Sequence, residues 1–207
     1  AAGDYKDAAS KAKRATAAQS YADGEAKFNA GDYTAASALF TAAAGYEDAA
    51  ERVRQSQLGV HYKAAETAFA NGDYPSAISE FEQAENFQDA AEQVLASTYA
   101  LADENEKKEE YAKAIEEFDS IGDYSDAKER IFAIGLARLN ANDFSLAEKA
   151  FETGGSSQSE DYYYYTQGKE LFSRKKYSDA KEQFKKCAVE DAADLCTACL
   201  LYTSPSP

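Results

Sequence analysis

One pattern occurs five times in this chain: an aromatic residue, Ala three positions later and Phe seven positions later. The spacing i, i+3, i+7 places all three side chains on one face of an α-helix. The small Ala between the two rings lets a neighbouring helix approach closely. The pattern therefore predicts five short helices, each buried on this face. The five sets are Tyr33/Ala36/Phe40, Tyr74/Ala77/Phe81, Tyr111/Ala114/Phe118, Phe144/Ala147/Phe151 and Tyr177/Ala180/Phe184.

A second motif, aromatic-x-Asp-Ala, begins thirteen residues after three of those leading aromatics. An Asp before a helix is a preferred N-cap, because its carboxylate accepts hydrogen bonds from unpaired backbone N–H groups. Each copy therefore predicts the start of a longer helix, which ends near Gly in AGDY, NGDY or a similar stretch. A fourth copy, at Tyr5, has no short helix before it, so we expect the chain to start within an array. The predicted caps are Asp7, Asp48, Asp89 and Asp126.

The distance from this motif to the next short helix changes in steps of four. It is 28 residues from Tyr46 to Tyr74, 24 from Phe87 to Tyr111 and 20 from Tyr124 to Phe144. Four residues are close to one helical turn, so removing four keeps the buried face in place. Loop insertions would not follow that step. The spacing therefore predicts that a continuous helix fills each interval.

Two columns of residues recur inside these longer helices. Twelve residues before each short helix stands an aromatic residue (Tyr21, Tyr62, Tyr99, Phe132 and Tyr165), and three residues later a small one (Gly24, Ala65, Ala102, Gly135 and Gly168). The small residues indicate close helix packing. The rings have two interpretations, which stay open here: core side chains, which we favour, or anchors for a bound peptide. The candidate peptide-binding residues are Tyr21, Tyr62, Tyr99 and Tyr165.

The stretch HYKAAETAFANGDYPSAISEFEQA, His61 to Ala84, resembles a tetratricopeptide repeat of a variant bacterial type. It has that family's small residue in the first helix, the G-D-Y hinge, and the Ala and aromatic of the second helix. The resemblance implies an all-α, right-handed solenoid of about five helix pairs plus the start of a sixth helix. It implies a single array over residues 1–198. The expected units are approximately 5–44, 46–85, 87–121, 124–154, 157–188 and a partial 190–198.

The hinge-to-hinge periods are 41, 37, 33 and 33 residues, so they depart from that family's period of about 34. The formal net charge is −15. Such a surface repels nucleic acid, whose binding depends on Lys and Arg, and favours basic partners. One segment differs, since residues 169–186 carry seven basic and three acidic side chains. Patches of opposite sign fit either different partners or copies that join end to end. No apolar stretch approaches the roughly 18 residues of a membrane helix.

The residues that usually perform catalysis are sparse. The single histidine, His61, cannot form a triad or a metal site by itself, and no G-x-S-x-G or Walker sequence occurs. We interpret Thr153 to Glu160 as a flexible inter-helix loop. We therefore expect no catalytic, cofactor-binding or metal-binding residues, and no enzyme activity. The predicted function is a non-catalytic protein-interaction scaffold or spacer, part of a larger bacterial protein of the cytoplasm or cell envelope. The alternatives are a self-assembling array and an accessory domain of an enzyme whose catalytic domain lies elsewhere.

The last nine residues, CLLYTSPSP from Cys199 to Pro207, do not continue the repeat. Pro205 and Pro207 end any helix, because proline lacks a backbone donor and disfavours helix in the residue before it. All nine resemble one translated reading frame of a transposon-type sequencing adapter. We therefore expect a non-native, extended tail with few contacts, on a metagenomic gene fragment. On this interpretation the C-x-x-C of Cys196 and Cys199 is neither a redox site nor a zinc site.

Overall fold

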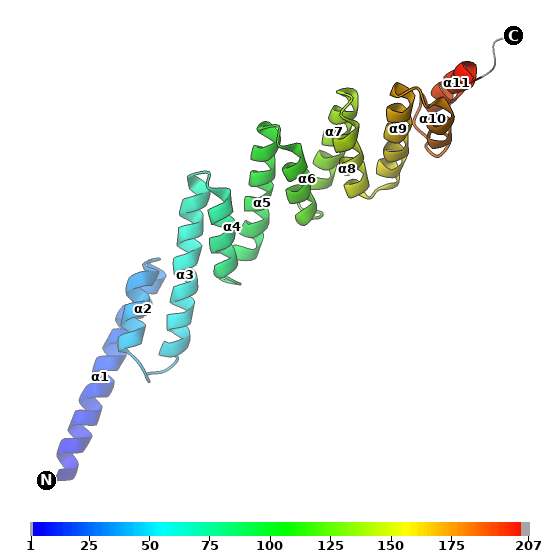
Figure 1. Cartoon of the computed structure of the whole chain (residues 1–207). Coiled ribbons are helices and arrows are strands. Elements are labelled where there is room, and N and C mark those ends of the chain that lie inside the picture. Colours follow the sequence, from blue (N-terminus) through cyan, green and yellow to red (C-terminus); the bar gives the residue numbers. More distant parts are fainter. Residues whose placement is uncertain (1, 204–207) are drawn as a thin grey trace. The chain divides into compact units, whose positions relative to one another are not determined.

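The computed structural model describes residues 2–203, and the side chains of residues 7–202, as an all-α, solenoid-like chain (Figure 1). Within that part there are five helix pairs and an eleventh helix, in agreement with the predicted fold class. The first helices of the pairs are α1 (Ala2–Asn29), α3 (Ala49–Ala70), α5 (Ala90–Lys107), α7 (Ala127–Asn140) and α9 (Ser157–Ser173). The second helices are α2 (Tyr33–Ala42), α4 (Tyr74–Gln83), α6 (Tyr111–Ser120), α8 (Phe144–Gly154) and α10 (Tyr177–Phe184), and α11 spans Ala192–Thr203.

The chain divides into two compact units, one ending at Ser97 and one beginning at Thr98, and the division falls within α5. In the first unit α1 packs on α2, α2 on α3, and α3 on α4. In the second unit each helix from α6 to α11 packs on the next one along the chain. Each unit is therefore built from contacts between helices that are close in sequence, as in repeat proteins.

The lengths of the first helices confirm that continuous helix fills the variable intervals. The helices α3, α5 and α7 have 22, 18 and 14 residues. Each is one turn shorter than the one before, as the spacing of the sequence motifs predicts. A whole-turn change keeps the same side of the helix facing its neighbours.

The stripe on the second helices is the centre of the core. All five of its Phe side chains are at most 2% exposed, and all five of its Ala residues are fully buried. The small residues of the first helices make room for these rings. A Cβ added to Gly135 would lie 2.6 Å from the Phe151 ring, and one added to Gly168 would lie 2.5 Å from the Phe184 ring. The helices of a pair therefore approach closely at these glycines.

Three of the five second helices begin with an Asp side-chain N-cap. Asp32, Asp73 and Asp143 accept hydrogen bonds from the backbone N–H three residues later, at 3.2, 3.3 and 3.3 Å. The residue before two of these caps is Gly31 (φ +75°) or Gly72 (φ +76°), in the left-handed region that favours glycine. The predicted stop at glycine is confirmed at these two hinges.

The N-cap prediction for the aromatic-x-Asp-Ala motif is wrong at the level of hydrogen bonding. Asp48 and Asp126 precede α3 and α7, but neither side chain accepts a bond from its helix. Their carboxylates are bound elsewhere, as described below. Asp7 lies inside α1, because the helix already begins at Ala2, and it pairs with Lys11 at 2.6 Å.

The prediction of an extended tail is wrong for Cys199 to Thr203, which belong to α11. Cys199 is fully buried, and the Tyr202 ring stacks on Tyr177 with the centroids 4.7 Å apart. The apolar side of α11 continues through these residues, and the prolines come too late in sequence to interrupt it. Pro205 and Pro207 lie outside the described residues. Between residues 2 and 203, no helix is long and apolar enough to cross a membrane.

Candidate functional site

The tyrosine column forms a repeated hydrogen bond between successive helix pairs. Each hydroxyl donates to the carboxylate of an Asp 26 or 27 residues later, next to the start of the following first helix. The bonds join Tyr21 to Asp48, Tyr62 to Asp89, Tyr99 to Asp126, and Tyr165 to Asp191, the last at 2.7 Å. The Asp residues therefore receive side-chain hydroxyls where backbone N–H groups were expected. We refer to these four contacts as the Tyr–Asp bonds.

The rings of the same tyrosines pack on the core stripe. Each lies against the Phe of its own pair, with centroids 5.3 Å apart for Tyr21, 5.4 Å for Tyr62, 5.3 Å for Tyr99 and 5.8 Å for Tyr165. Tyr62 and Tyr165 are 6% exposed, and the other two are half-buried. Of the two interpretations of this column, the packing favours core side chains over peptide anchors.

The fourth pair lacks both partners of the Tyr–Asp bond. Its column residue is Phe132, which has no hydroxyl, and the residue 27 positions later is Ser159 in place of Asp. Ser159 is buried and its hydroxyl contacts that of Ser156 at 2.9 Å. Phe132 packs instead on the Tyr162 ring, at 5.3 Å. A buried carboxylate at this position would have no tyrosine hydroxyl to bind, so the two changes accompany each other.

The Tyr–Asp bonds help to raise the pKa values of the four tyrosines, and the bond from Tyr62 also lowers the pKa of its Asp. The hydrogen bond to Asp48 raises the pKa of Tyr21 to about 12. Burial, and then the bond to Asp89, raises the pKa of Tyr62, while the Tyr62 hydroxyl lowers the pKa of Asp89. At neutral pH Tyr62 therefore keeps its proton and donates it in the hydrogen bond, and Asp89 is an ionised acceptor. These are properties of a structural bond and offer no activated nucleophile or base.

Two arginines reinforce the same junctions. Arg52 and Arg130 each follow a Tyr–Asp aspartate by four residues. Arg52 pairs with Glu25, with Nη2 2.7 Å from Oε2, and its guanidinium lies 4.1 Å from the centre of the Phe28 ring. Arg130 pairs with both Asp103 and Glu106, at 2.9 and 2.7 Å. The pairing with Arg130 also explains Glu106, which stands where the other four first helices carry an apolar residue, namely Phe28, Phe69, Leu139 and Phe172.

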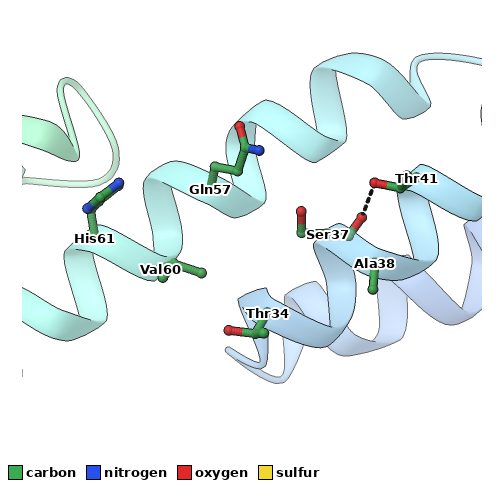
Figure 2. Close-up of a pocket in the computed structure, with 7 residues that line it drawn as sticks. All are labelled: Thr34, Ser37, Ala38, Thr41, Gln57, Val60 and His61. Atoms are coloured by element: carbon green, nitrogen blue, oxygen red, sulfur yellow. Dashed lines mark hydrogen bonds between the residues drawn. The ribbon is translucent and has the colours of Figure 1, made fainter.

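The open groove between α2 and α3 is the best candidate for a binding surface (Figure 2). It has a volume of about 550 Å³. Val60, whose side chain is directed toward α2, is 38% exposed and is the largest apolar residue of the lining. No carboxylate, Lys or Arg lines this groove. The lining residues are Thr34, Ser37, Ala38 and Thr41 from α2 and Gln57, Val60 and His61 from α3.

His61 and Thr41 are held in place by neighbours on their own side of the groove. His61 Nδ1 lies 2.8 Å from the Glu80 carboxylate. The Thr41 hydroxyl donates to the Ser37 carbonyl at 2.8 Å (Figure 2). The Ser37 and Thr34 hydroxyls keep capacity for further hydrogen bonds. The groove therefore combines one apolar contact with several uncharged donors and acceptors.

The segment from Thr153 to Glu160 is a tight junction, which corrects the prediction of a flexible loop. Gly155 ends α8 with φ +60°, and Ser156 caps α9 by accepting the Ser159 backbone N–H at 3.0 Å. Only these two residues separate the helices, because a left-handed glycine followed by a Ser cap reverses the chain at once. A second hollow, of about 430 Å³, lies beside this junction and is bordered by Glu152 and Glu160.

The sequence expectation missed the Tyr–Asp bonds and the groove. The bonds had a detectable signal, because the spacing from Tyr to Asp is 27 residues in the first three bonds while the period varies. The groove had none, because repeat spacing does not show which face of a helix remains uncovered. Within the described part of the chain, no group of three or more His, Cys, Asp or Glu is placed to hold a metal ion. The sequence matches no protein-family model, and comparison with curated proteins found no significant match.

Proposed function

We propose that this chain is a non-catalytic protein-interaction scaffold, and that the groove between α2 and α3 binds a peptide segment. The observation that carries the proposal is the exposed Val60 in a lining that contains no Asp, Glu, Lys or Arg, in a chain of net charge −15. Charged side chains are depleted at the centres of protein interfaces, because burying them costs more than burying hydroxyls or apolar groups. The ligand fits best as an uncharged segment with basic residues on either side.

The hydrogen bonds and ion pairs of the polar side chains support a structural role. Hydroxyls and carboxylates that could act in catalysis are bound to each other in the Tyr–Asp bonds. Arg130 is bound to two carboxylates, and His61 to Glu80. We also propose that the repeats are of the tetratricopeptide type, in a bacterial variant form within a larger protein. The G-D-Y hinge, the short second helix and the packing of its Ala and Phe support that assignment.

The test is selection of binders from a displayed library of random peptides on the immobilised chain. We expect Val60→Glu to weaken a selected peptide at least tenfold, because it places a charge in the groove. The matched control is Ala133→Glu, which adds the same charge at an exposed position of α7 and should change affinity less than twofold. Peptides that bind both variants equally well would refute this groove as the site.

We propose, finally, that residues 199–207 are not native to the protein. The support is their match, over all nine positions, to a translated adapter sequence. Amplification of the source locus across codon 199 tests this directly. Different codons after Ala198 are expected. The same nine codons in genomic DNA, continuing into further coding sequence, would refute it.

A further inference from the structure

Three cysteines gather where α10 meets α11. Cys187 lies shortly after α10, and Cys196 and Cys199 lie one turn apart on α11. All three belong to one apolar cluster, in which Cys199 is fully buried and the other two are partly buried. None is in a disulfide. The proposed function makes no use of these residues.

Two of the thiols are held on the same strip of α10. Cys187 Sγ donates to the Phe184 carbonyl at 3.3 Å, and Cys196 Sγ donates to the Lys181 carbonyl at 3.5 Å. Carbonyls three residues apart lie on neighbouring turns of one helix face, roughly 5 Å from each other. The end of α10 therefore holds both sulfurs against neighbouring turns of one helix, from segments on either side of the turn into α11.

Cys199 does not fit as a partner of Cys196. Side chains three apart on a helix have Cβ atoms about 5–6 Å apart, whereas a disulfide needs about 3.5–4.5 Å. Both residues lie within α11, so a bond between them would unwind it. Cys187 has no such restriction, because the backbone between Cys187 and Ala192 is not helical.

We propose that Cys187 and Cys196 are a disulfide-forming pair, and that a small disulfide such as oxidised glutathione converts them to a cross-link that fastens α11 to α10. The Cys196 thiolate attacks one glutathione sulfur, forms a mixed disulfide and releases one glutathione. The Cys187 thiolate then attacks Cys196 Sγ and releases the second. The two cysteines lose two electrons and two protons, and the two glutathione thiols gain both.

Burial raises the pKa of the Cys187 thiol, so it remains protonated at neutral pH. We therefore assign it the second, intramolecular step, in which the nearby mixed disulfide compensates for a low thiolate fraction. The cross-link closes a short loop between residues 187 and 196. It stabilises the α10–α11 contact by restricting the unfolded chain.

The experiment equilibrates the reduced full-length chain with oxidised glutathione, alkylates the remaining thiols and measures the intact mass. We expect one alkylated thiol, the loss of two hydrogen atoms, and no bound glutathione. Trypsin leaves all three cysteines in one peptide, because no Lys or Arg follows Lys186. A glutamate-specific protease cuts after Glu190 and should give a linked pair of peptides containing Cys187 and Cys196. The melting temperature should rise by roughly 5 °C and fall again with a reducing agent.

Cys187→Ser and Cys196→Ser should abolish the cross-link, and Cys199→Ala should retain it. The readout is covalent, so a modest loss of stability in Cys199→Ala does not obscure the result. The proposal is overturned by three alkylated thiols at equilibrium, by a persistent glutathione adduct, by a Cys196–Cys199 bond, or by a bond between chains. None of these outcomes bears on the peptide groove at Val60.

Discussion

Tyr62 and Asp89 are joined across two consecutive helix pairs by a hydrogen bond from the hydroxyl to the carboxylate. The other carboxylate oxygen accepts from the Gln93 side chain at 2.9 Å. The Tyr62 ring at the same time packs on Phe81. One side chain therefore contributes both to the core of its own pair and to the attachment of the next.

Replacing Tyr62 with Phe removes the hydroxyl and keeps the ring. We expect a loss of about 1–2 kcal/mol in the free energy of unfolding, the range for a hydrogen bond to a charged group that is partly solvated. Urea unfolding of Tyr62→Phe, Asp89→Asn and the double variant measures the coupling between them. Tyr74→Phe is the control, because no hydrogen bond is found for the Tyr74 hydroxyl. Additive effects of the two changes would contradict the bond.

The raised pKa of Tyr21 predicts a loss of stability in alkali. The pKa is about 12 in the folded chain and 10.0 for an ordinary tyrosine. The folded state thus holds the Tyr21 proton more tightly than the unfolded state does. The stability that the Tyr21–Asp48 bond contributes is therefore fully present below pH 10 and is lost as the pH rises through 12. Melting temperatures between pH 8 and 12 should fall less steeply in Tyr21→Phe than in the parent. If the melting temperatures of the two proteins fell equally with pH, Tyr21 would not donate a hydrogen bond to Asp48.

The fourth pair offers a test by restoration. Ser159 is 2% exposed, so Ser159→Asp buries a carboxylate without a tyrosine donor and should cost about 2 kcal/mol or more. Adding Phe132→Tyr supplies the hydroxyl and should recover part of that loss. Phe132→Tyr alone is the control, measured by urea unfolding on the same scale. A double variant no more stable than Ser159→Asp would show that this pair cannot hold a Tyr–Asp bond.

Gly135 is required by its distance from Phe151. We expect Gly135→Ala to destabilise the chain by about 1–3 kcal/mol, although Ala favours helix, because the new methyl group meets the ring. Phe151→Leu leaves more room there, so the double variant should be more stable than the sum of the two single effects predicts. Thermal unfolding monitored by circular dichroism measures all three. Equal or greater stability of Gly135→Ala would contradict the close approach.

Phe81→Ala tests the stripe itself. Phe81 is 2% exposed, and truncation of a buried Phe costs about 3–5 kcal/mol. The urea midpoint should fall accordingly, and Phe69→Ala, which removes a ring that is 36% exposed, should lower it much less. Similar midpoints for the two variants would mean that the i, i+3, i+7 face is not the core.

The helices could be predicted from sequence because their signals are local. Phe40 and Phe81 each stand at helical spacing from the aromatic residue and the Ala that precede them, and the four-residue steps between motifs are visible without knowledge of any contact. The partners of Asp48 and Asp126 were missed because they lie 27 residues away, on a different helix pair. A carboxylate before a helix looks the same in sequence whether it binds its own backbone or a distant hydroxyl. The helix at Cys199 to Thr203 was missed because the prolines that follow act only on residues next to them.

In the first three pairs, all variation in length lies at one point of the repeat. From Tyr to the next Asp the chain always counts 27 residues in the first three pairs, but from Asp to the next column residue it counts fourteen after Asp48, ten after Asp89 and six after Asp126. The segment from the column Tyr to the next Asp thus has a constant length, and the first helix that leads from that Asp to the next column residue varies in whole turns. Such a chain can lengthen or shorten a first helix by gaining or losing four residues, without altering any Tyr–Asp bond.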